Sequence, residues 1–338
     1  MEYGAIDLHS RSSLIRIVDG EGAVVLERTI ATTRESLTRV FGGRAPLRVL
    51  LESGTDSGWV AATLEGLGHD VIVADPNYAL MYGARGRAVK TDRRDVAALV
   101  EACRRGIYRR AHRVSPAQRS VRRMLRVREQ LVRIRTQLIN LLRAQLRQEG
   151  YRLRSGASET ASRRCRALAL PGAFADELAP VLAVLDALGP LLLARDRDAQ
   201  HRAAADPIVR RVMTAPGVGP IVGLTYRAVL DDVQRFADAK QCTAYVGLVP
   251  REASSGTRHR QGAITKAGPS ALRVALIQAA WVIWRQRQGR AALHAWVERL
   301  AARRGRRIAI VALARRLARI LYAMWRDETA YAAVPATA

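Results

Sequence analysis

Apolar and polar positions alternate in short runs near the start of the chain. The runs cover residues 3–8, 14–18 and 23–29, and the polar, glycine-rich segment 19–22 separates the second run from the third. A period of two predicts strands, and a glycine-rich turn between two such runs predicts an antiparallel meander. The sequence therefore predicts three consecutive strands.

Strand and helix patterns then take turns. Apolar runs at 47–51 and 71–74 predict a fourth and a fifth strand, and stretches at about 33–41 and 57–67 have helical spacing. Three strands followed by alternating helix and strand is the order of a ribonuclease-H-like fold. The pattern alone also fits other α/β layers.

A long helix is predicted over residues 116–148, where apolar residues recur at intervals of three and four, as in a coiled-coil seam. Its other faces carry Arg122, Arg123, Arg126, Arg128, Arg133, Arg135, Arg143 and Arg147. Such charges can simply be solvated. Because Glu129 is the only acid of the segment, the single sign of charge favours a nucleic-acid surface.

The rest of the chain divides into a connector and a second globular unit. Residues 150–168 are polar and rich in Ser and Arg, which is typical of a linker, and PGVGP at 216–220 lies between two helical patterns. That turn can point N–H groups at a phosphate or be a plain helix corner. We expect an α/β domain over residues 1–112, a coiled coil and linker over 113–206, and a mainly α-helical domain over 207–330.

The charge of the chain indicates a polyanionic partner. Its 338 residues include 56 Lys and Arg against 30 acids, a net charge of +26, for which nucleic acid is the default candidate. Residues 1–80 hold 7 Arg and 11 acids, a net of −4, so the remainder carries +30. All but three of the basic residues are Arg, which suits bidentate phosphate contacts and is also expected of a GC-rich genome.

Cysteine usage and hydropathy indicate a cytoplasmic protein. Cys103, Cys165 and Cys242 are widely spaced and form no metal-ligand pattern, which fits a reducing compartment without disulfides. The N-terminus lacks the features of a signal peptide. The apolar stretches 179–194 and 270–284 are shorter than a span of about 20 residues, so we expect no membrane helix.

Four acids form the first candidate site. Asp7 lies near the end of the first strand, Glu52 follows the fourth apolar run, and Asp92 and Asp95 are three apart with helical spacing. If they converge, divalent cations must bind between them, as two-metal phosphoryl transfer requires. Each acid taken singly could instead cap a strand, begin a loop or serve the first turn of a helix.

A polar loop within residues 245–268 forms the second candidate site. Ser254 and Ser255 precede Gly256 among cationic residues, so either hydroxyl could attack a phosphate. An ordinary Ser-Gly turn is the alternative, and His259 is more typical of a phosphate or structural contact than of a catalytic base. The candidate nucleic-acid contacts are Lys90, Arg93, Arg122, Arg126, Arg133, Arg251, Arg258, Arg260 and Lys266.

Motifs along nearly the whole chain resemble one family. They are GAIDLHS, ESG, KTDRRDVAAL, PGVGP, AYVGLVPREASSG followed by ITKAG, and the closing RRGRRIAIVALARRLARILYAM. Their order and spacing resemble the DEDD transposases of insertion-sequence family 110, which include the Piv-type DNA invertases.

The resemblance implies both chemistry and partners. It makes Asp7, Glu52, Asp92 and Asp95 the tetrad of a RuvC-like domain that binds Mg²⁺. It places a covalent nucleophile immediately before the glycine, at Ser255, with Ser254 in reserve. It also implies a noncoding bridge RNA that pairs with target and donor DNA.

We therefore expect a recombinase that cuts and rejoins DNA through a phosphoserine link. The two sites lie about 160 residues apart on either side of a coiled coil, which favours a composite site in a homodimer or homotetramer. One alternative is a metal-dependent, junction-resolvase-like nuclease in which water attacks. Another is a nucleic-acid-binding protein without catalysis.

Overall fold

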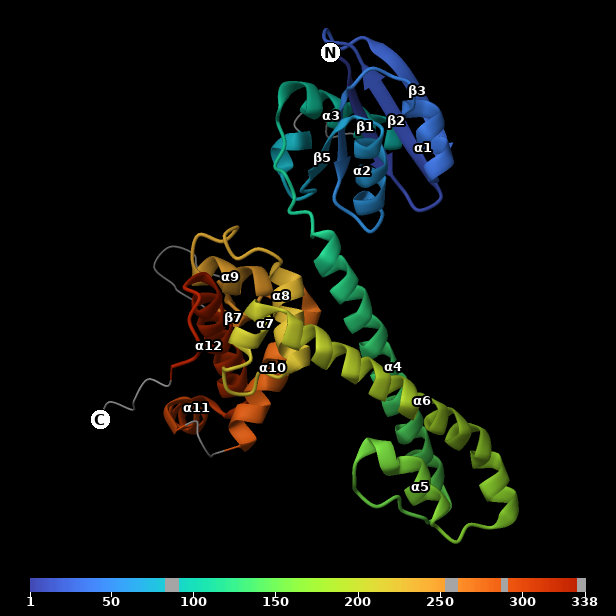
Figure 1. Cartoon of the computed structure of the whole chain (residues 1–338), viewed down its shortest axis with the longest axis vertical. Helices are drawn as coiled ribbons and strands as arrows, with labels where there is room; N and C mark the ends of the chain where they lie inside the picture. The colour runs from blue at the N-terminus through green and yellow to red at the C-terminus, as the bar shows by residue number, and fades with distance from the viewer. Residues whose placement is uncertain (83–90, 253–260, 287–290, 333–338) are drawn as a thin grey trace. The chain divides into compact units, whose positions relative to one another are not determined.

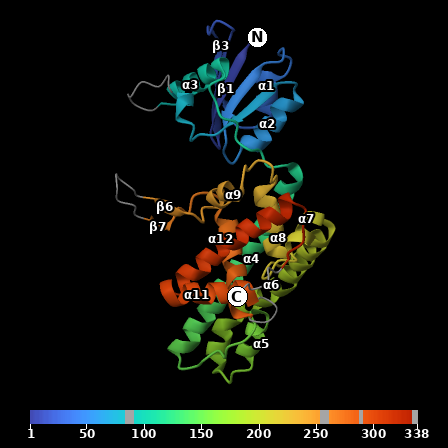
Figure 2. The same cartoon turned by 90° about the vertical axis from the view of Figure 1, so that its left-hand side faces the viewer.

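The structure, a computed structural model, describes residues 1–82, 91–252, 261–286 and 291–332. They form two compact units, Met1–Arg113 and Val114–Ala338, here the N-terminal and C-terminal units. The N-terminal unit combines a sheet with helices, and the C-terminal unit is mainly helical (Figures 1 and 2). The predicted division into an α/β and a helical region is confirmed.

The sheet of the N-terminal unit has five strands, as predicted. They are β1 (Tyr3–Leu8), β2 (Ser12–Val18), β3 (Val24–Ala31), β4 (Arg48–Glu52) and β5 (Asp70–Ala74). Their order is β3-β2-β1-β4-β5. The meander β1-β2-β3 is antiparallel, whereas β4 lies parallel to both β1 and β5.

Helices cover both faces of this sheet. They are α1 (Arg34–Phe41), α2 (Ser57–Gly66) and α3 (Asp92–Arg105), with a short 3₁₀ helix η1 (Ala79–Tyr82). Ile6 and Leu51 pack in the core under α1 and α2, whereas Ala5 and Leu50 pack in the core under α3. Because side chains alternate along a strand, neighbouring residues of β1 and β4 face opposite layers.

The C-terminal unit begins with the predicted long helix, α4 (Pro116–Gln148), capped by the Ser115 side chain. The next elements are η2 (Ser158–Thr160), α5 (Ala161–Arg166) and α6 (Gly172–Ala205). Helices α4 and α6 lie side by side, and α5 packs at one end of the pair (Figure 1). The expected linker 150–168 thus contains a short helix, in which Cys165 is fully buried.

Six more helices and a two-stranded hairpin complete this unit as far as the structure describes it. They are α7 (Pro207–Val212), α8 (Pro220–Leu230), α9 (Ala239–Val246), β6 (Pro250–Glu252), β7 (Gln261–Ile264), α10 (Ser270–Arg285), α11 (Ala291–Arg304) and α12 (Arg306–Arg326). Buried apolar residues from α8 to α12 form one core. Tyr226 and Tyr322 are buried there, and their hydroxyls donate to the carbonyls of Ala318 and Phe236.

One helix among the described residues, α6, is long and apolar enough to cross a membrane. A single such helix is weak evidence, because core helices of soluble proteins share this length and composition. In α6 the side chains of Leu178, Leu182 and Leu185 are buried in a core shared with α4. They contribute to packing within the C-terminal unit.

Candidate functional site

Two of the four predicted acids meet at one edge of the sheet. Ile6 of β1 pairs with Leu51 of the parallel strand β4, and Asp7 and Glu52 are the next residue of each strand. Because side chains alternate, Asp7 and Glu52 face the layer occupied by α3 rather than the layer of Ile6 and Leu51. Strand register therefore brings these two carboxylates together.

The first turn of α3 supplies the other two acids. Thr91 caps the helix by accepting a hydrogen bond from the Arg94 amide, and Asp92 is the first helical residue. Asp95 is 6% exposed, whereas the Asp92 side chain is 71% exposed. The helix dipole stabilises acidic side chains in a first turn, which is one reason for acids at these positions. Here, however, Asp95 is also buried on the side of the helix that faces the sheet.

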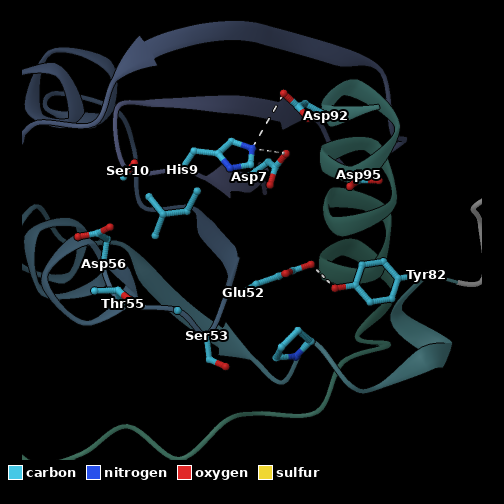
Figure 3. A pocket seen from close by; sticks show the side chains of 13 residues that line it. Asp7, His9, Ser10, Glu52, Ser53, Thr55, Asp56, Tyr82, Asp92 and Asp95 are labelled. Atoms are coloured by element: carbon cyan, nitrogen blue, oxygen red, sulfur yellow. Dashed lines mark hydrogen bonds and ion pairs between the residues drawn. The ribbon is translucent and has the colours of Figure 1, made fainter. Parts of the chain in front are cut away.

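All four acids line a single pocket of about 800 Å³ (Figure 3). Besides them, its lining consists of Leu8, His9, Ser10, Ser53, Gly54, Thr55, Asp56, Pro76 and Tyr82. The pocket thus collects acids from β1, β4 and α3, three elements that are not consecutive in the chain.

The pocket disfavours negative charge on Asp7. Partial burial raises the pKa of the Asp7 carboxyl, and the neighbouring Asp92, Asp95 and Glu52 raise it further, while His9 acts in the opposite sense. Desolvation and like charge both penalise a carboxylate, and a bound cation relieves both penalties. The electrostatics of the pocket therefore fit a cation site.

His9 is a pocket residue that the sequence reasoning missed. Its Nε2 atom lies 3.4 Å from Oδ2 of Asp7 and 4.0 Å from Oδ2 of Asp92. One ligand atom from each of these three residues lies within 4.8 Å of the others, so they could hold a metal ion together. The only signal in the sequence was its place two residues after Asp7, where the strand ends.

Two further contacts organise the rim. The Tyr82 hydroxyl donates a hydrogen bond to Oε1 of Glu52 (Figure 3). Asp56 also lines the pocket, but its Oδ1 accepts a hydrogen bond from Trp59 Nε1 at 3.0 Å. Tyr82 was not singled out by the sequence reasoning, because nothing in the sequence links it to Glu52.

The donor chemistry of the pocket fits hard divalent cations. Four carboxylates supply oxygen ligands, which Mg²⁺ and Mn²⁺ prefer, and the pocket holds no cysteine among its lining residues. Asp7 and Glu52 are fixed at strand ends, and Asp92 is exposed enough to meet a ligand.

Two family models match this chain. The DEDD transposase model of IS110, described as "Transposase", matches residues 5–150, and a model described as "Transposase IS116/IS110/IS902 family" matches residues 209–295. A "Probable family 20 transposase" of Pseudomonas aeruginosa is 31% identical over 96% of this chain and 97% of its own length. The chain belongs to the IS110 family of transposases.

Relatives of named insertion sequences agree with that membership. The "Transposase for insertion sequence element IS1111A" of Coxiella burnetii is 29% identical over 93% of this chain and 86% of its own length. The "Transposase for insertion sequence element IS1328" of Yersinia enterocolitica is 27% identical over 96% and 97%. As a transposase, the protein is a DNA-modifying enzyme, and DNA is its partner.

The predicted nucleophile of this IS110 transposase lies outside the described residues. Ser255, its reserve Ser254, and the cationic residues Lys90, Arg258, His259 and Arg260 all belong to the segments 83–90 and 253–260. Of the same candidate contacts, Arg251 on β6 and Lys266 after β7 are exposed.

The base of the β6–β7 hairpin is tightly built. Gly247 ends α9 with a φ of 74°, and a Cβ there would lie 2.0 Å from the Ala267 carbonyl oxygen. Gly268 makes the reciprocal approach to the Tyr245 carbonyl. The Arg273 guanidinium donates to the Val246 carbonyl at 2.9 Å. Gly247 and Gly268 therefore allow the backbones on the two sides of the hairpin base to approach closely.

The candidate arginines of the transposase differ in their surroundings. Arg122 donates from Nε and Nη2 to the carbonyls of Ala228 and Val229 at the end of α8, and burial lowers the pKa of its guanidinium. The Arg122 guanidinium therefore stabilises the C-terminal end of α8 within the C-terminal unit. Arg126 is exposed, as are Arg93, which pairs with Glu27, and Arg133, which pairs with Glu129.

Proposed function

We propose that this chain cuts and rejoins DNA at the ends of an insertion sequence, with Asp7, Glu52, Asp92 and Asp95 holding Mg²⁺. The observation that carries the proposal is the convergence of these four acids on one pocket from β1, β4 and α3. Convergence of this kind is costly without cations, as the raised pKa of Asp7 indicates. His9 is an additional candidate ligand.

The proposal includes a RuvC-like, ribonuclease-H-like N-terminal domain. Its support is the sheet order β3-β2-β1-β4-β5, in which an antiparallel meander is followed by two parallel strands. Helices on both faces agree with the same fold class. We also interpret α4 and α6 as the coiled-coil connector, since their apolar side chains share one core.

Phosphoryl transfer needs positioned charge. Bound divalent cations would neutralise the charge of the phosphate, activate the attacking oxygen and stabilise the leaving oxygen. The fold holds the carboxylates that would bind them. Strand register places Asp7 and Glu52, the cap of α3 places Asp92 and Asp95, and Tyr82 orients one oxygen of Glu52.

The proposed nucleophile is Ser255, with Ser254 in reserve. The serine hydroxyl gives up its proton as its Oγ attacks the scissile phosphorus, the phosphorus–oxygen bond to the deoxyribose breaks, and the leaving oxygen takes up a proton. The hydroxyl of another DNA end then attacks the phosphoserine and releases the serine. Because the phosphoester bond energy is kept in this link, rejoining needs no ATP.

The proposed partners are DNA and a bridge RNA, held by a homodimer or homotetramer. The net charge of +26, to which the residues after position 80 contribute +30 and residues 1–80 contribute −4, supports binding to nucleic-acid backbones. Base pairing by the RNA would supply sequence choice, so that the protein needs no helix that reads bases. A site shared between subunits would unite the acid pocket of one with the serine of another.

The deciding experiment looks for a covalent adduct. The protein, Mg²⁺, RNA transcribed from the flanking region and matching DNA are incubated, and a denaturant-resistant protein–DNA adduct is sought. We expect an adduct in wild type that is lost in Ser255→Ala and in Asp7→Asn, but retained in Asp56→Asn, because Asp56 is bound to Trp59. Cleavage without any adduct would instead support a metal-dependent nuclease, and loss of the adduct only in Ser254→Ala would move the nucleophile to Ser254.

A further inference from the structure

A second pocket, of about 420 Å³, lies where α4 ends, and three arginines dominate its lining. The lining residues are Arg143, Arg147, Arg152 and Leu153. Arg143 and Arg147 are one helical turn apart on α4, so they share a face, and Arg152 comes from the chain that follows the helix. The end of α4 lies beside α5 (Figure 1).

A defined helix stop returns Arg152 to this face. Gly150 has a φ of 79°, its amide donates to the Arg147 carbonyl at 3.3 Å, and the Tyr151 amide donates to the Leu146 carbonyl at 2.8 Å. These two bonds form a Schellman motif, which reverses the chain at a glycine. The position of Arg152 relative to α4 is therefore set by backbone hydrogen bonds.

Apolar packing anchors the same turn. Tyr151 stacks on Phe174 of α6 at a ring-centroid distance of 6.3 Å, and Leu146 is fully buried. Leu153 packs against the same core, which α4, α5 and α6 share. The backbone that carries the three arginines is thus held in place before any ligand arrives.

The charge of the pocket is uncompensated within the described part of the chain. None of its lining residues is acidic, and Arg143, Arg147 and Arg152 form no ion pair among the described residues. By contrast, Arg128 and Arg135 of the same helix pair with Asp196 and Glu159. Like charges one turn apart repel each other and destabilise a helix, so a bound anion would relieve this repulsion.

We propose that Arg143, Arg147 and Arg152 bind the phosphodiester backbone of a nucleic acid. Guanidinium groups present paired N–H donors that match phosphate oxygens, and three of them around one pocket fit consecutive phosphates. The exposed side of each arginine leaves room for a chain to pass. This inference rests on the proposed function only in its choice of nucleic acid as the partner, because any phosphodiester has the required chemistry.

The test measures binding without catalysis. Full-length protein in EDTA is titrated against labelled duplex DNA from an insertion-sequence end and, separately, against labelled RNA from the flanking region, at several salt concentrations. The variant is Arg143→Gln/Arg147→Gln/Arg152→Gln. The matched control, Arg163→Gln/Arg197→Gln/Arg210→Gln, removes the same charge from exposed arginines elsewhere in the C-terminal unit.

We expect the pocket variant to lose affinity on the order of tenfold or more, and its slope of log affinity against log salt to fall by about 2 to 3, since each lost phosphate contact removes about 0.9. Loss on the DNA arm, the RNA arm or both identifies the source of the phosphates. If the pocket variant matches the control variant on both arms, the proposal is overturned. Thermal unfolding tests whether both variants are folded. The binding assay needs no strand transfer, so its outcome can be interpreted even if the catalytic proposal fails.

Discussion

The hydroxyl of Tyr82 donates a hydrogen bond to Oε1 of Glu52, the acid that ends β4. Tyr82 is the last residue of η1, so this bond ties the segment after β5 to the acidic pocket. A hydrogen bond to one carboxylate oxygen fixes the direction of the other, which matters where that carboxylate must meet a cation.

Removal of this hydroxyl should weaken metal binding. In Tyr82→Phe, Glu52 loses an orienting donor, and we expect the Mg²⁺ concentration for half-maximal DNA cleavage to rise about tenfold or more. Titration of Mg²⁺ in the cleavage assay measures the change. Tyr78→Phe is the matched control, because its ring contacts Arg109 outside the pocket lining, and an equal effect of both variants would contradict the role of Tyr82.

Asp7 should lower the stability of the protein when no cation is bound. Its pKa is raised in the folded state, so the fold disfavours the carboxylate, and this cost is present above the folded pKa and disappears as pH falls toward the ordinary value of 3.8. In EDTA at pH 7 we expect Asp7→Asn to unfold a few degrees higher than wild type, roughly what 1 kcal/mol gives.

Two comparisons test whether the charge of Asp7 causes this difference in melting temperature. The advantage of Asp7→Asn should shrink as the pH of the melting experiment is lowered, and saturating Mg²⁺ should stabilise wild type more than the variant. Asp56→Asn keeps a side-chain oxygen that can accept the hydrogen bond from Trp59, so this control should not raise the melting temperature. A lower melting temperature for Asp7→Asn at pH 7 in EDTA would refute the electrostatic account.

Gly247 should tolerate no side chain. In Gly247→Ala the new Cβ would lie 2.0 Å from the Ala267 oxygen at a φ of 74°, so both strain and collision act. We expect a loss of about 3 kcal/mol or more in the free energy of unfolding, measured by urea titration. Gly305→Ala is the control: φ is 84° there but nothing lies within 4 Å, so about 1 kcal/mol is expected. Equal losses would show that the close approach is unimportant.

Substitutions of Arg122 and Arg126 should have different effects, the first on stability and the second on nucleic-acid binding. Arg122→Gln removes two hydrogen bonds to the carbonyls that end α8, so we expect about 1–3 kcal/mol of destabilisation with an unchanged salt slope for DNA binding. Arg126→Gln changes an exposed side chain, so we expect unchanged stability and, if Arg126 contacts a phosphate, a slope lower by about 1. Paired urea titrations and binding isotherms decide, and the opposite pattern would exchange the two roles.

The sequence predicted regular elements where a local signal was strong. Helix α4 begins and ends at the predicted residues because Ser115 caps it, Pro116 suits its first turn and Gly150 stops it. The sequence did not predict a short helix whose few apolar residues are separated by polar ones. Residues 150–168 look like a linker, yet Ala161 and Cys165, four apart, bury one face of α5.

The sequence by itself determined the five strands, the long helix, and which four acids lie at strand ends or in a first helical turn, because hydrophobic period, capping residues and glycine turns act over a few residues. Only the tertiary structure decided that His9 approaches Asp92, that Tyr82 reaches Glu52, that Arg122 serves α8, and that Arg152 returns to the face of Arg143. Those relations join residues brought close by strand register and helix packing, and contacts between residues distant in the chain leave no periodic trace in one sequence.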